Sequence, residues 1–103
     1  MKSLILTRPY DREFSGRKAR VTYHLSDSEL QITLTPPDGN AIIQPLKMSE
    51  NPEEIYKALS ERAIGSARNF LSQPAVRSWI AETYAEFLEA YKGQAEQNKS
   101  QDQ

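Results

Sequence analysis

The residues of this chain that are best suited to bind a partner lie near its beginning. Four arginines and a lysine stand between positions 8 and 20 beside two aromatic residues, and a single histidine follows. A guanidinium group binds a carboxylate or a phosphate through paired hydrogen bonds, and an aromatic ring stacks on a base or fills a protein pocket. These residue types predict a contact surface. Its expected members are Arg8, Tyr10, Arg12, Phe14, Arg17, Lys18, Arg20 and His24.

Charge is unevenly distributed along the chain. Residues 1–25 hold six basic and two acidic side chains, whereas residues 26–103 hold seven basic and twelve acidic ones, so a formal net charge of −1 hides a basic end and an acidic remainder. The basic end favours an anionic partner. In the alternative interpretation, its charges are neutralised within the protein by Asp11, Glu13 and acidic helices.

The chain offers few groups for catalysis. His24 is its one histidine, and cysteine is absent, so thiol nucleophiles, thiolate metal sites and disulfides are excluded. The glycines are isolated rather than grouped in a phosphate-binding loop. Glu82, Glu86 and Glu89 share one helix face and lack converging ligands, which favours a solvated face over a cation site. We expect a protein that is not an enzyme and uses no cofactor or metal.

Length and composition point to one small globular domain. A chain of 103 residues with 38% hydrophobic and 26% charged residues is long enough to bury a core of its own. The apolar run near the N-terminus is too short for a signal peptide, and no run approaches the ~18 residues that a transmembrane helix needs. Together with the absence of cysteine, this predicts a soluble cytoplasmic protein without a membrane partner.

The first half of the sequence has the alternating pattern of strands. The clearest strands cover 18–25, with alternate apolar residues Ala19 to Leu25, and 29–35, which should pair antiparallel with it. A short strand at 3–7 and an edge strand at 41–46 complete the expected set. Polar loops or turns are expected at 8–16, 26–28 and 36–40.

The second half has the three- and four-residue spacing of helices. Asn51 and Pro52 form a helix start, and an apolar stripe continues from Ile55 to Leu71, with Gly65 weakening the middle. Pro74 restarts the chain as a second helix that should stop at residues 92–93. Residues 1–93 then form the domain, and the polar residues 94–103 form a flexible tail.

Because a small sheet and two amphipathic helices are each marginal alone, they should cover one another. The predicted fold class is therefore α+β, an antiparallel meander of three or four strands packed on a C-terminal helical hairpin. The outer sheet face should carry polar residues: Lys18, Arg20, Thr22, His24, Gln31, Thr33 and Thr35. Trp79 and Tyr56 flank the apolar stripes, and two interpretations stay open for them: core residues, or an exposed patch that forms a homodimer.

Two functions are consistent with these features. The first is a non-catalytic regulatory or interaction protein that docks on a larger protein through the arginine- and aromatic-rich segment and the outer sheet face, or by strand addition at a sheet edge. The alternative is a nucleic-acid-binding protein in which the same basic side chains contact phosphates and Tyr10, Phe14 or Tyr23 stack on bases. A pI near 5.8 is low for the second function.

Overall fold

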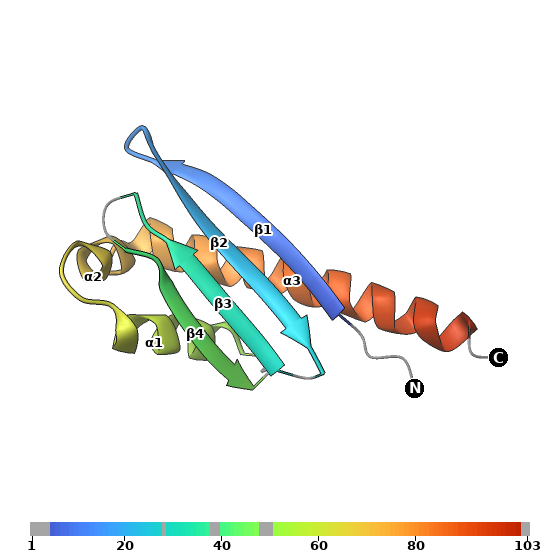
Figure 1. Cartoon of the computed structure of the whole chain (residues 1–103). Helices are drawn as coiled ribbons and strands as arrows, with labels where there is room; N and C mark the ends of the chain where they lie inside the picture. The colour runs from blue at the N-terminus through green and yellow to red at the C-terminus, as the bar shows by residue number, and fades with distance from the viewer. Residues whose placement is uncertain (1–4, 28, 38–39, 48–50, 102–103) are drawn as a thin grey trace.

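The computed structural model describes residues 5–27, 29–37, 40–47 and 51–101. It has the predicted α+β architecture: a four-stranded antiparallel meander with the strand order β1-β2-β3-β4, followed by helices that lie on one face of the sheet (Figure 1). The strands are β1 (Ile5–Phe14), β2 (Arg17–Ser26), β3 (Glu29–Thr35) and β4 (Ile42–Lys47), and the helices are α1 (Pro52–Arg62), α2 (Ser66–Leu71) and α3 (Pro74–Gln101).

The predicted loop at residues 8–16 is wrong, because most of it belongs to β1. This strand runs to Phe14 and pairs with β2 over its whole length, from Ile5 opposite Ser26 to Phe14 opposite Arg17. Ser15 and Gly16 form the turn with φ values of 54° and 77°, the left-handed pair that a tight two-residue hairpin needs. Residues 3–4 of the first predicted strand, and residues 28 and 38–39 of the predicted turns, lie outside the described residues.

Alternation along the strands gives the sheet two different faces. The inner face is apolar in its middle, and the outer face carries the seven polar residues that the sequence predicts there, each exposed or half-buried. Each edge strand contains one proline, Pro9 in β1 and Pro45 in β4. Proline has no amide hydrogen to donate, so it hinders the pairing of another strand along either edge. Strand addition, one predicted docking mode, is therefore disfavoured.

Helix α1 begins as the sequence predicts. The Asn51 side chain accepts a hydrogen bond from the Glu53 amide at 3.0 Å, and Pro52 occupies the first turn. The predicted single helix to Leu71 is wrong, however, because the chain leaves the helix at Ala63. Gly65 then adopts φ 59° and ψ −130° as the N-cap of α2. This conformation is available to glycine and costly for other residues.

Helix α3 is longer than predicted. It passes through Gly93, where the sequence predicts a stop, and continues to Gln101. In Figure 1 its C-terminal part extends beyond the sheet. The predicted boundary between domain and tail at residues 93–94 therefore lies inside a continuous helix, and the flexibility of the tail stays a prediction.

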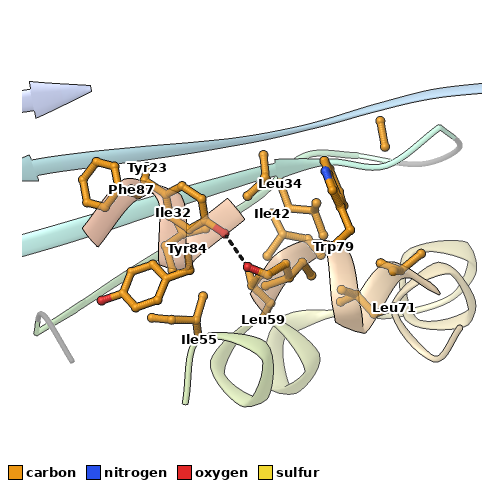
Figure 2. Close-up of a cluster of buried hydrophobic side chains, with 14 of the residues drawn as sticks. Tyr23, Ile32, Leu34, Ile42, Ile55, Leu59, Leu71, Trp79, Tyr84 and Phe87 are labelled. Atoms are coloured by element: carbon orange, nitrogen blue, oxygen red, sulfur yellow. Dashed lines mark hydrogen bonds between the residues drawn. The ribbon is translucent and has the colours of Figure 1, made fainter. Parts of the chain in front are cut away.

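The core lies between the inner sheet face and the helices (Figure 2). Its largest fully buried side chains include Trp79, Tyr23, Tyr84 and Phe87, so Trp79 is a core residue and not part of an exposed dimer patch. The Tyr23 hydroxyl donates to the Ile80 carbonyl at 3.2 Å and lies 2.8 Å from the Thr83 hydroxyl. Burial raises the pKa of Tyr23, so this phenol stays neutral and its polar atom is satisfied inside the core.

Candidate functional site

The structure divides the eight predicted binding residues into two groups. Lys18, Arg20 and His24 lie on the outer face of β2, and the other five lie on the helix side of the sheet, as the alternation of the strands requires. These five are Arg8, Tyr10, Arg12, Phe14 and Arg17. The eight residues therefore do not form one continuous surface.

The aromatic members of the predicted set belong to the packing of the protein. Phe14 makes edge contacts with Phe70 and Trp79, with ring centroids 5.3 Å apart in each pair. Tyr10 packs edge-on against Tyr23, which is fully buried. Burial raises the pKa of the Tyr10 hydroxyl, and the nearby Glu86 carboxylate adds to this shift. These rings stabilise the edge of the core and are poorly placed to stack on a ligand.

The two arginines on the helix side of β1 have different partners. Arg12 forms an ion pair with Glu82 at 3.4 Å between Nη2 and Oε2. The Arg8 guanidinium donates to the Thr7 carbonyl at 3.1 Å. Arginine can cover an apolar edge with its methylene chain while its charged end stays in water. The long inward side chains of β1 thus line the margin of the core.

Charges on the outer face occur as opposite pairs on neighbouring strands. Each acidic residue of the described outer strand positions lies directly across from a basic one. The pairs are Asp11 with Arg20, Glu13 with Lys18, and Glu29 with Lys47. These three acidic and three basic side chains cancel, so the described part of the outer face is neutral as a whole.

Asp11 is the centre of the tightest of these groups. Its carboxylate accepts two hydrogen bonds from Arg20, at 2.7 Å from Nε and 3.2 Å from Nη2, and lies 3.5 Å from the Lys18 ammonium. The hydrogen bonds from Arg20 hold the pKa of Asp11 below its ordinary value. In return, Asp11 raises the pKa of Arg20. Arg12, Lys18 and Arg20 therefore pair with acidic side chains of the protein itself, as the alternative interpretation of the sequence expects.

Between the charge pairs lies a band of neutral polar residues, which the sequence predicted only in part. His24 sits opposite Thr7 on β1 and Gln31 on β3, and its Nδ1 lies 2.6 Å from the Thr7 hydroxyl. Thr22 and Thr33 face each other on β2 and β3. We call these five residues the neutral band. Thr7 is absent from the predicted outer-face residues because the first predicted strand ends at this residue. Continuing the alternation of inward and outward residues through β1 places Thr7 on the outer face.

Comparisons with known proteins give no relative for this chain. No protein-family model matches it, and neither the curated proteins nor the solved structures contain a match. Among the described residues, no group of three or more His, Asp or Glu side chains is placed to hold a metal ion. No helix within the described ranges is long and apolar enough to cross a membrane.

Proposed function

We propose that this protein is a non-catalytic binding protein that docks on a larger protein through the outer face of its sheet. The observation that supports this proposal best is that the helices cover only the inner face, leaving four paired strands as a rigid, uncovered platform (Figure 1). The neutral band and the flanking charge pairs give this platform many hydrogen-bonding groups in fixed positions. Lys18, Arg20 and His24 remain its proposed contact residues, Lys18 and Arg20 as members of the charge group around Asp11. The cytoplasmic location stays the expectation drawn from the sequence.

The balance of charge favours a protein partner over a nucleic acid. A polyanion is bound by an excess of basic side chains, and the described outer face carries equal numbers of acids and bases. Base stacking needs accessible rings, whereas Tyr23 is buried and Phe14 packs on Trp79. A partner surface with both donors and acceptors matches this face better than a row of phosphates does.

A comparison of two variants that gain the same side chain tests this proposal. Thr33→Arg places a bulky charge in the neutral band, whereas Ala85→Arg places it at an exposed position of α3. Tagged wild-type protein should capture a stoichiometric protein from lysate of its source cells after nuclease treatment, identified by mass spectrometry. Thr33→Arg should abolish this capture, and Ala85→Arg should leave it unchanged.

Two results would contradict the proposal. In one, the captured protein is retained equally by both variants, which would move the docking surface away from the outer face. In the other, the captured material disappears with nuclease and the purified protein binds single-stranded oligonucleotides with an affinity that falls steeply as salt rises. That outcome would favour the nucleic-acid alternative.

A further inference from the structure

A groove at the first half of β4 adjoins the neutral band, because Ile43, which lines it, is the cross-strand partner of Thr33. It lies between this strand and the segment that joins α1 to α2, and its volume is about 470 Å³. The large apolar side chains in the described part of the protein are buried or half-buried, apart from three exposed isoleucines. Two of the three, Ile43 at 52% and Ile64 at 81% exposure, line this groove. The third, Ile5, is at the far end of the sheet on the opposite edge strand.

The fold places these two side chains at the groove for separate reasons. Ile43 points to the outer face of an edge strand, where no further strand or helix covers it. Ile64 lies in the break between α1 and α2, where Gly65 turns the chain with a positive φ. Ile42 and Ala67, both buried, also line the groove. The groove therefore has apolar walls that face solvent, an arrangement that is costly unless a partner covers it.

Arg62 gives the groove its charge. It is the one charged residue among those that line the groove, and its Nε donates to the Gln44 side-chain oxygen at 2.8 Å. Because Gln44 is neutral, this contact does not offset the positive charge of the guanidinium beside the apolar walls. A guanidinium that is fixed in this way by a neutral group suits a carboxylate on a ligand.

We propose that this groove binds a peptide segment of another protein, which inserts a large apolar side chain next to an aspartate or glutamate. Its volume lies within the range of about 300–1,000 Å³ that is usual for ligand sites. Pro45 interrupts the hydrogen-bonding edge of β4, so the segment is held by its side chains and not as an added strand. Ile43 places one rim of the groove beside Thr33 of the neutral band, whereas Arg62 and Ile64 lie away from the outer face, where α1 ends and α2 begins.

A second copy of the chain is a poorer occupant of this groove. Outside the groove, the described residues present one exposed large apolar side chain, Ile5, and no acidic residue lies within three positions of it in the sequence. The acidic residues on the outside of α3, such as Glu86 and Glu89, have no exposed large apolar neighbour among the described residues. The required pair of an apolar and an acidic side chain is therefore expected on a different protein.

A random dodecapeptide library displayed on phage tests the proposal. The full-length protein is the bait, and peptides that also bind the Ile64→Ser variant are removed by counter-selection. The enriched peptides should share a large apolar residue within three positions of an acidic one. Synthetic copies should bind at least about tenfold more weakly to Ile64→Ser and several-fold more weakly to Arg62→Gln. Ile5→Ser is the matched control, and it should bind them as the wild-type protein does.

Ile5, Ile64 and Arg62 are all exposed, so the three variants should fold. An unchanged fluorescence spectrum of the buried Trp79 verifies this. Selection of no peptide that distinguishes wild type from Ile64→Ser would overturn the proposal, as would peptides that lack acidic residues or bind Arg62→Gln with undiminished affinity. A wild-type dimer in solution that Ile64→Ser converts to a monomer would also overturn it, in favour of a second copy. Thr33 lies opposite Ile43, but peptide binding is measured directly on the Ile64 and Arg62 variants, so this result does not depend on the outcome of the Thr33→Arg experiment.

Discussion

Replacement of Gly65 by alanine separates the observed helix break from the continuous helix that the apolar spacing predicts. In a continuous helix this change would stabilise the protein by about 1 kcal/mol, since alanine is the better helix former. Gly65 instead has φ 59° and ψ −130°, and an added Cβ would meet no atom within 4 Å. The substitution therefore tests the backbone conformation alone. We expect Gly65→Ala to destabilise the protein by about 1–3 kcal/mol.

The assay is thermal and urea unfolding followed by circular dichroism. For a domain of this size, each kcal/mol corresponds to about 4–8 °C in Tm, so a loss near 2 kcal/mol lowers Tm by about 8–16 °C. Gly93→Ala is the matched control, because Gly93 lies inside α3 with open space around it, and this change should stabilise the protein by up to about 1 kcal/mol. A Gly65→Ala variant as stable as the wild type would refute the break between α1 and α2.

Three further predictions concern the core and the ion pairs. Tyr23→Phe should destabilise the protein by about 1 kcal/mol in urea unfolding, since it removes the buried hydroxyl while Thr83 keeps its bond to the Ile80 carbonyl; a loss above about 3 kcal/mol would contradict this assignment. Phe14→Ala should lower the free energy of unfolding by about 2 kcal/mol, roughly half the value for a fully buried ring, because Phe14 is only partly buried. It should also shift the fluorescence emission of Trp79 to the red, since the two rings are in contact. Unchanged stability would return Phe14 to the binding residues. The pKa of Asp11 is lowered in the folded protein, so the stability it contributes is present above about pH 4 and is lost as pH falls through that lowered pKa. Arg20→Gln should raise the pKa of Asp11 towards its ordinary value, measured by NMR titration, and no change would exclude Arg20 as the cause.

The strands were predictable where one face is fully buried. In β3, and in β2 from Ala19 onwards, every second residue is apolar, so the sequence pattern identifies both the strands and their inner faces. In β1 the inward positions include Arg8 and Arg12, which stay exposed at the margin of the core, where Arg12 pairs with Glu82 of α3. Its inward positions mix arginines with apolar residues, and its outward positions include Ile5 and Pro9, so a search for alternating apolar and polar residues does not detect the strand.

The ends of the helices could not be predicted from the spacing of apolar residues, because they depend on the backbone conformation of single residues. Nothing in the spacing of Ile55, Leu59 and Ala63 shows that the chain leaves the helix at Ala63, since the stripe continues into α2. A glycine such as Gly65 is compatible with a weakened helix or with a turn. Gly93 resembles a stop signal, yet α3 continues through it, because a glycine in helical conformation costs only about 1 kcal/mol.

The candidate site was predictable in its outer-face members and not in its extent. Alternation in β2 was enough to put Lys18, Arg20 and His24 on one face. The pairing of Arg20 with Asp11 depends on the register of a strand that was predicted as a loop. The groove beside Ile64 depends on the break between α1 and α2. Both features arise from tertiary geometry that residue types alone do not specify.

The order of the elements has a consequence during synthesis of the chain. The sheet is complete in sequence at Lys47, but the buried rings that cover it, Trp79, Tyr84 and Phe87, are 32 to 40 residues further on. At a translation rate of about 5–20 residues per second, the apolar face of the nascent sheet stays uncovered for about 2–8 s. Exposed sheet edges would recruit other chains in this interval, and Pro9 and Pro45 hinder such pairing at both edges. The two prolines are therefore expected to matter most before the protein has finished folding, by limiting aggregation of the newborn chain.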